Sequence, residues 1–215
     1  MIVPVFLERQ SLLDNMEYQF QFYPTILNEY QRYLGEPNAS AKEKLLNRIN
    51  RIPERDPEIL ARFKKGISFE AAVLKNQARE FIPELIQEAS LLLPKRKKTQ
   101  QLLTFQHKNI RFYGYADVLG ESRVIDLKST SNHKPGRHDL NFQTLYLYAL
   151  LDAGFKRMEY IICDFEKIYI EIYNAEQYDF DLLLAKMESF RNFLLEHHHL
   201  ITDKKIMRPV PKGLF

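Results

Sequence analysis

The sequence predicts an α/β fold in which a central mixed β-sheet is flanked by helices. Three observations lead to this prediction. The first third of the chain shows helical periodicity, residues 100–130 are rich in β-branched and aromatic side chains, and further helical and strand patterns follow to residue 196. A chain of 215 residues is long enough to bury a sizeable core, and we expect a single domain.

The N-terminal third is expected to consist of helices. Residues 25–34, "TILNEYQRYL", and residues 41–52, "AKEKLLNRINRI", carry apolar side chains at spacings of three and four. A further short helix is expected to end near Gly66. Another is expected from about Ser68 to Phe81, because Pro83 would stop it.

The middle and the end of the chain are expected to supply the sheet and two more helices. Between residues 100 and 130, the runs "QLLTFQ", "IRFYGYADVL" and "SRVIDLKST" are separated by "HKN" and "GES", which predicts an antiparallel meander. A helix from about Asp139 to Ala153 should follow. The runs "KRMEYIICDF" and "KIYIEIYN" then predict two more strands, before a last helix from about Asp179 to Glu196.

Two of the predicted strands carry acids within their apolar runs. Because successive side chains of a strand alternate between faces, Asp126 and Lys128 share one face while Ile125 and Leu127 take the other. Asp117 lies near the end of the preceding strand. If the two strands are neighbours, both carboxylates and the ammonium group converge at one end of the sheet.

Such a convergence predicts a metal site. Two adjacent carboxylates repel each other and stay ionised only when a cation lies between them. An oxygen-only ligand set, without cysteine or histidine, suits Mg²⁺ or Mn²⁺. A lysine beside such a site can hold water or a phosphate during hydrolysis of a phosphodiester. The alternative interpretation makes Asp126 and Lys128 a surface ion pair on an edge strand.

The order of the motifs from residue 24 to residue 165 resembles the PD-(D/E)XK nuclease superfamily, and within it the RecB-like branch. "YPTILNEYQRYL" resembles the helix that opens this branch, and "GISFEAAV", "GYAD", "VIDLKST" and "FQTLYLYALL" resemble its successive motifs. The resemblance implies a restriction-endonuclease-like core at about residues 66–175. A helical N-terminal extension at about 1–65 and a C-terminal helix with a basic tail at about 176–215 would complete the domain.

The resemblance also implies a role for each matching residue. The metal would be bound by Glu70, Asp117, Asp126 and the backbone carbonyl of Leu127, and Lys128 would be the catalytic lysine. Gln143 and Tyr146 would face the site from the following helix, as residues three apart share a helix face. The branch places its tyrosine four residues after the glutamine, where this chain has Leu147, so Tyr146 and Tyr148 stay open as alternatives.

Two other acids could replace Glu70, and the single cysteine bears on a different cofactor. Glu80 and Glu84 are alternatives to Glu70, although acids near helix ends usually face solvent. Some members of the branch hold an iron–sulfur cluster with four cysteines. Cys163 is the only cysteine here, so no such cluster is expected.

Basic residues beside the site predict contacts with DNA. The net charge is only +3, so the local clusters matter more than the sum. We expect phosphate contacts from the loop "STSNHKPGRHD" and from "PKRKK", through Lys134, Arg137, Lys95, Arg96, Lys97 and Lys98. The N-terminus shows no secretory signal, and no apolar stretch approaches the roughly 20 residues of a membrane span, so cytoplasm is expected.

The resemblance favours an exonuclease of DNA repair, recombination or phage replication, acting on DNA ends with partner proteins from those processes. A site- or structure-specific endonuclease of the same fold is one alternative. A nucleic-acid-binding module with an inactive site is a second, and a scaffold protein whose acids are surface charges is a third. Metal binding and burial of the two aspartates distinguish these alternatives.

Overall fold

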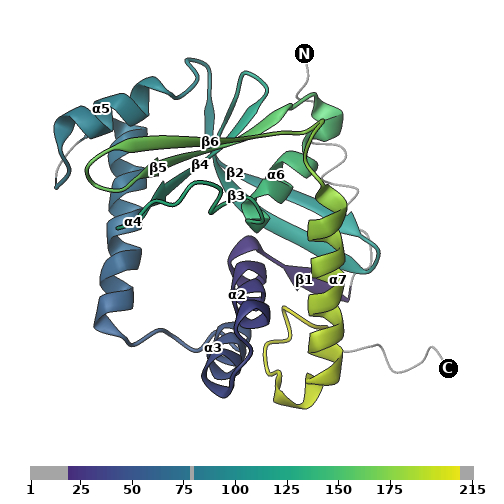
Figure 1. Ribbon diagram of the computed structural model, residues 1–215. Helices are drawn as coiled ribbons and strands as arrows, with labels where there is room; N and C mark the ends of the chain where they lie inside the picture. The colour runs from purple at the N-terminus through teal and green to yellow at the C-terminus, as the bar shows by residue number, and fades with distance from the viewer. Residues whose placement is uncertain (1–18, 78–79, 209–215) are drawn as a thin grey trace. The chain divides into compact units, whose positions relative to one another are not determined.

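The computed structural model describes residues 19–77 and 80–208 (Figure 1). The chain divides into two compact units. The first unit combines residues up to 53, residues 103–114 and residues from 179 onward. The second combines residues 54–102 and 115–178. Each unit is therefore built from segments that lie far apart in the sequence. The single domain predicted from the sequence stays a prediction.

Within the described residues, the first unit holds three helices, one short strand and parts of two further strands. The helices are α2 (Pro24–Gly35), α3 (Ala39–Ile49) and α7 (Phe180–Glu196), followed by a 3-10 turn at His198–Leu200. Strand β1 (Phe20–Phe22) pairs in parallel with the start of β3 (Ile110–Gly120). Helices α2 and α7 contact each other, since the Tyr30 hydroxyl and the Ser189 hydroxyl are 2.8 Å apart. All three helices occur where helical periodicity predicts them.

The second unit holds the rest of the sheet. Its strands are the start of β2 (Lys98–His107), the end of β3, β4 (Arg123–Ser129), β5 (Arg157–Cys163) and β6 (Ile168–Asn174). In the order β3-β4-β5-β6, the first and last pairs are antiparallel while β4 and β5 are parallel. The helices are α4 (Pro57–Lys75), α5 (Pro83–Leu91) and α6 (Leu145–Tyr148). The predicted α/β fold with a mixed sheet flanked by helices is confirmed.

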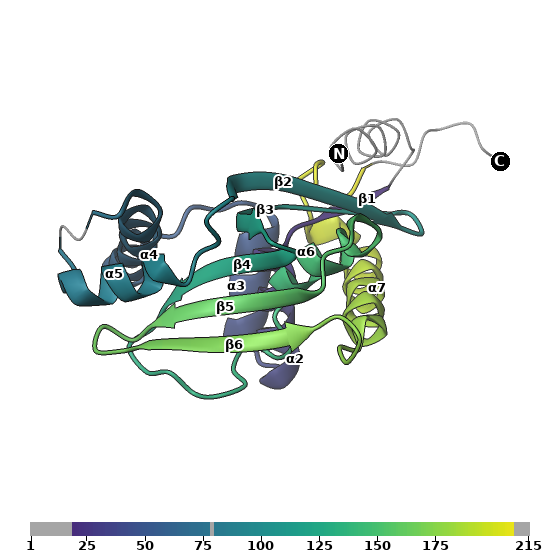
Figure 2. The ribbon, with the colours of Figure 1, turned by 90° about the horizontal axis from the view of Figure 1, so that it is seen from above.

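The two faces of this sheet differ in character. One face supplies Ile125, Leu127 and Ile161 to an apolar core that also contains residues of α4 and α5. Figure 2 shows these two helices beside the strands. By alternation, Asp126 and Lys128 take the opposite face. On that face the Tyr160 and Thr144 hydroxyls, 2.8 Å apart, tie β5 to the 3-10 turn at Phe142–Thr144 that precedes α6. The pleat of β4 thus separates a dry core from a polar face.

Three predicted helix boundaries are wrong. Helix α4 continues through Gly66, where an added Cβ would make only an ordinary contact with the Ser129 hydroxyl oxygen at 3.6 Å. Pro83 begins helix α5 instead of ending a helix, because a proline at the first helical position needs no amide hydrogen. The helix expected at 139–153 is instead α6 between 3-10 turns at Phe142–Thr144 and Leu151–Ala153.

Within residues 19–77 and 80–208, no helix combines the length and apolar character needed to cross a membrane. The N-terminus, for which no secretory signal is expected, lies outside these residues. The last seven residues of the predicted basic tail lie outside them too.

Candidate active site

Asp117 and Asp126 come together where β3 and β4 stop pairing. The paired residues run from Gly120↔Arg123 to Val118↔Ile125. At Asp117, the next residue of β3 before Val118, the side chain and not the backbone makes the contact with β4. Its Oδ2 accepts a hydrogen bond from the Leu127 amide at 2.8 Å. Both aspartates are buried, with 9% and 4% of their surface exposed. They are therefore not exposed surface charges.

Lys128 provides the positive charge closest to these acids. Its Nζ lies 2.6 Å from Oδ2 of Asp126, as expected for residues two apart on one strand face. This Oδ2 is buried and makes no hydrogen bond of suitable geometry. The pair is thus an electrostatic contact that leaves a lone pair of the carboxylate open to a further partner.

Glu70 joins the two aspartates from helix α4, through a residue that the sequence analysis missed. Gln100, at the start of β2, donates from Nε2 to Glu70 Oε1 at 2.6 Å and to Asp117 Oδ1 at 3.2 Å. Glu70 is half-buried, whereas the alternatives Glu80 and Glu84 are exposed. We call Glu70, Asp117, Asp126 and Lys128 the carboxylate site.

The electrostatics of the carboxylate site favour protonation of Asp117 and Glu70. Burial, then repulsion from Asp126 and Glu70, raises the pKa of Asp117 from 3.8 to about 8, against the hydrogen bond from Leu127 and the charge of Lys128. Burial and the charge of Asp126 also raise the pKa of Glu70. One lysine therefore does not compensate three converging carboxylates.

Tyr146 lies near this region on the segment after β4, and Gln143 precedes it on the same segment. Tyr146 is buried on α6, and its pKa is raised by burial first and then by the charges of Asp126 and Asp117. Gln143 lies half-buried in the preceding turn, where its amide nitrogen donates to the Asn141 side chain at 3.3 Å. The effect of both aspartate charges on the pKa of Tyr146 indicates that its hydroxyl lies near them. Tyr148, the alternative, is only partly buried.

The donor set of the carboxylate site fits a hard divalent cation in its chemistry. It offers carboxylate oxygens without sulfur or imidazole, and one buried oxygen of Asp126 has no hydrogen bond. As they stand, however, no three His, Cys, Asp or Glu side chains in the described ranges have the spacing of a metal site. The Gln100 amide, an N–H donor, lies between Glu70 and Asp117.

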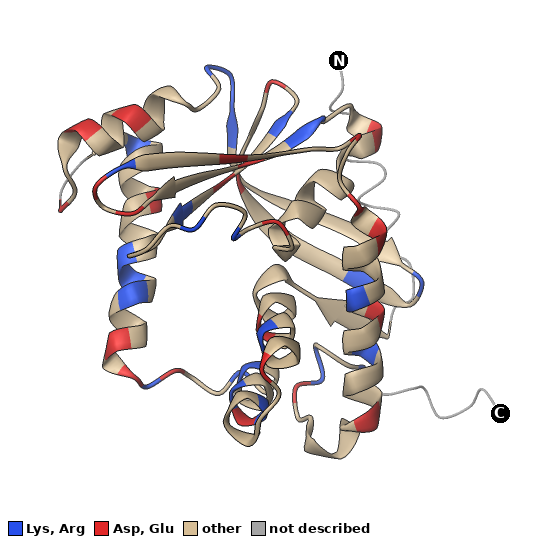
Figure 3. Cartoon of the chain, in the orientation of Figure 1, with Lys and Arg blue, Asp and Glu red and all other residues tan. Residues whose placement is uncertain are grey.

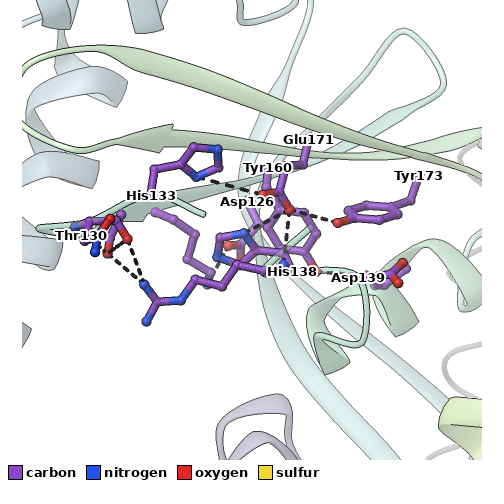
Figure 4. A network of polar contacts seen from close by, with 12 residues as sticks. Asp126, Thr130, His133, His138, Asp139, Tyr160, Glu171 and Tyr173 are labelled. Atoms are coloured by element: carbon purple, nitrogen blue, oxygen red, sulfur yellow. Dashed lines mark hydrogen bonds and ion pairs between the residues drawn. The ribbon is translucent and has the colours of Figure 1, made fainter. Parts of the chain in front are cut away.

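A second polar cluster lies on the same unit, between the loop after β4 and strand β6 (Figure 4). Glu171 Oε2 accepts hydrogen bonds from the Tyr173 hydroxyl at 2.8 Å and the His138 backbone amide at 3.1 Å. It also lies 3.2 Å from His138 Nδ1, while His133 Nδ1 lies 3.9 Å from Oε1. The His138 ring stacks on Tyr160 with centroids 4.8 Å apart. We call His133, His138, Glu171 and Tyr173 the histidine network.

The basic residues predicted to contact DNA are all exposed. Lys134 and Arg137 lie on the loop that the histidine network fixes, and Figure 3 shows basic positions on that loop and along α4. Arg137 is held by its own loop, because Nη1 donates to the Thr130 hydroxyl at 2.9 Å and to the Asn132 carbonyl at 3.2 Å. Residues 95–97 form the exposed turn before β2, which begins at the exposed Lys98.

Comparison with known proteins adds little to this geometry. No family model matches the chain, and no curated protein is similar to it. One solved structure, titled "Crystal structure of SSO0001", is 16% identical, covers 90% of this chain and 86% of its own, and gives a TM-score of 0.45. Similarity at this level carries no argument about function, so the site has to be interpreted from its own chemistry.

Proposed function

We propose that the chain is a metal-dependent nuclease of the PD-(D/E)XK superfamily, closest to its RecB-like branch, that hydrolyses phosphodiester bonds of DNA. One observation carries the proposal. The buried carboxylates of Asp117 and Asp126 lie on adjacent strands, with Glu70 nearby. The Lys128 ammonium contacts Asp126, but one positive charge does not balance three carboxylates. A site that holds this much uncompensated negative charge suits a divalent cation.

In this proposal Glu70, Asp117, Asp126 and the Leu127 carbonyl oxygen would hold Mg²⁺ or Mn²⁺. When bound, the metal polarises the scissile phosphate and lowers the pKa of a bound water. The Lys128 ammonium, fixed by Asp126, faces the negative charge that the phosphate gains as water attacks. Tyr146 and Gln143, on the segment after β4, would help to orient the substrate.

DNA would pass beside the loop after β4. Lys134 and Arg137 are exposed on this loop, and Lys95, Arg96, Lys97 and Lys98 are exposed around the start of β2. Each phosphate that these residues neutralise releases counterions, so binding should weaken steeply with salt. The resemblance in sequence makes DNA ends the expected substrate, in repair, recombination or phage replication.

The test is a cleavage assay with end-labelled linear DNA and closed circular DNA, each single- and double-stranded. Wild type should cleave with Mg²⁺ or Mn²⁺ and be inactive in EDTA. With Ca²⁺, which accepts looser coordination, it should bind DNA without cleaving it. Asp126→Ala should lose both metal binding and cleavage. Glu84→Ala serves as the matched control, because it removes an exposed acid elsewhere on the same unit.

The outcomes separate the alternatives. Cleavage of linear DNA alone supports an exonuclease, whereas cleavage of closed circles supports an endonuclease of the same fold. DNA binding without cleavage in any metal indicates an inactive binding module. Cleavage that persists in EDTA, or an Asp126→Ala variant as active as wild type, rules out the proposed chemistry.

A further inference from the structure

Gln100 occupies an unusual position at the carboxylate site. Its backbone has a φ of 51°, in the left-handed region that residues other than glycine seldom adopt, although it lies in strand β2. Such conformations persist where the surrounding structure holds them, and they cluster at functional sites. Here the side-chain nitrogen is held between Glu70 and Asp117, at 2.6 Å and 3.2 Å from their oxygens.

We propose that Gln100 is a further ligand of the metal site, and this inference rests on the proposed function. In the structure its amide N–H group lies between the carboxylates of Glu70 and Asp117. On metal binding, the side chain turns and presents its carbonyl oxygen to the same cation.

The chemistry of a primary amide supports both arrangements. The nitrogen carries two N–H donors and the oxygen two acceptor sites, so a half-turn about the last side-chain bond exchanges donor for acceptor at the same place. Hard divalent cations accept glutamine carbonyl oxygens alongside carboxylates. In the arrangement seen, the Nε2 group of Gln100 is a hydrogen-bond donor that Glu70 and Asp117 share.

The neighbouring residue shows what a glutamine on this strand does without such a role. Gln101 donates from Nε2 to the Thr99 carbonyl at 2.8 Å, a local contact on its own strand. Gln100 instead makes its contacts 30 and 17 residues away, on α4 and β3. Gln101 is therefore the matched control for any substitution of Gln100.

The first experiment measures metal affinity without cleavage. Calorimetric titrations with Ca²⁺ and Mn²⁺ are performed on the full chain as wild type, Gln100→Ala, Gln100→Glu, Gln101→Ala and Asp126→Ala. Gln100→Ala should bind about 10-fold more weakly, the scale seen when a site loses a supporting group. Gln100→Glu should bind at least as tightly as wild type, because it keeps an oxygen and adds a charge. Gln101→Ala should match wild type.

The second experiment uses wild type, so it does not depend on whether a variant of Gln100 folds. In ¹⁵N-labelled wild type, the side-chain amide signals of Gln100 should move towards those of a solvated glutamine when Ca²⁺ displaces the N–H group from the carboxylates. Signals that stay in place, or a Gln100→Ala variant that binds metal as well as wild type, overturn the inference while leaving the proposed function intact. Wild type that binds neither metal at an Asp126-dependent site overturns both.

Discussion

The carboxylate site and the histidine network both bury acids on the second unit, and they treat them in opposite ways. At the carboxylate site, burial and neighbouring acids raise the pKa of Asp117. In the histidine network, burial alone would raise the pKa of Glu171. Hydrogen bonds from Tyr173 and from the His138 backbone, with the His138 ring, outweigh burial and lower it.

This difference separates an acid whose charge is met by donors of the protein from one whose charge is not. Glu171 receives its donors from the protein and thereby fixes the loop after β4 to strand β6. Asp117 and Asp126 receive one amide, one shared side-chain amide and one ammonium among them. Their remaining charge has to be met by protons or by a cation from solution.

The largest expected effect follows from the role proposed for Lys128 in cleavage. Lys128→Ala should lower the single-turnover cleavage rate by at least ~10²-fold, because it removes the positive charge that faces the phosphate in the transition state. Mn²⁺ affinity and DNA binding in Ca²⁺ should stay close to wild type. Tyr173→Phe, which removes a donor from the histidine network, should cleave within about 2-fold of wild type. Equal losses in the two variants would erase the distinction between the regions.

A second prediction concerns stability without metal. Between pH 4 and about pH 8, folded Asp117 keeps a proton that the unfolded chain has lost, so the free energy of unfolding decreases as pH rises. Asp117→Asn removes this cost and should raise the melting temperature at pH 8 by roughly 6 °C, with little change at pH 4. Thermal unfolding in EDTA across this range measures the effect. A variant less stable than wild type at pH 8 would contradict the raised pKa.

The histidine network should show the opposite dependence on pH. Because the folded-state pKa of Glu171 is lowered, its contribution is present above the ordinary value of 4.5 and is lost as pH falls through the folded-state pKa. Glu171→Gln should therefore lower the melting temperature at pH 7 by roughly 4 °C, and by less at pH 3. If the proposed metal site exists, added Mg²⁺ should stabilise this variant as much as wild type, because the network shares no residue with the proposed ligands.

The smallest expected effect is on DNA affinity. Arg137→Ala should weaken DNA binding in Ca²⁺ only a few-fold and reduce the slope of log affinity against log salt by about one. Fluorescence anisotropy at several salt concentrations measures both quantities. Lys167→Ala, which removes an exposed cation in the turn between β5 and β6, is the control. An unchanged slope for Arg137→Ala would place the DNA elsewhere.

Local pattern predicted much of this arrangement. The alternation of side chains along β4 placed Asp126 and Lys128 on one face, and the structure pairs them. The segment 139–153 did not follow its pattern, because Leu145, Tyr146 and Leu147 are consecutive and all buried, so no amphipathic face guides a regular helix. Enclosure on several sides is set by tertiary packing, which periodicity does not report.

The contacts made by Gln100 and Glu171 could not be predicted from the sequence, for a related reason. Gln100 meets Glu70 across 30 residues, and Glu171 meets His138 across 33. Neither residue belongs to a motif, and each depends on how a strand is placed beside a distant segment. Only the paired strands and the packed helix reveal them.

The hydrogen bond from the Leu127 amide to Asp117 has a spectroscopic consequence. A backbone N–H that donates to a carboxylate resonates at a different frequency when the carboxylate becomes neutral or turns towards an ion. The Leu127 cross-peak in a ¹⁵N spectrum should therefore follow the charge of Asp117 directly, as pH or metal concentration is varied. The chain carries its own indicator of the state of the site, with no chemical label attached.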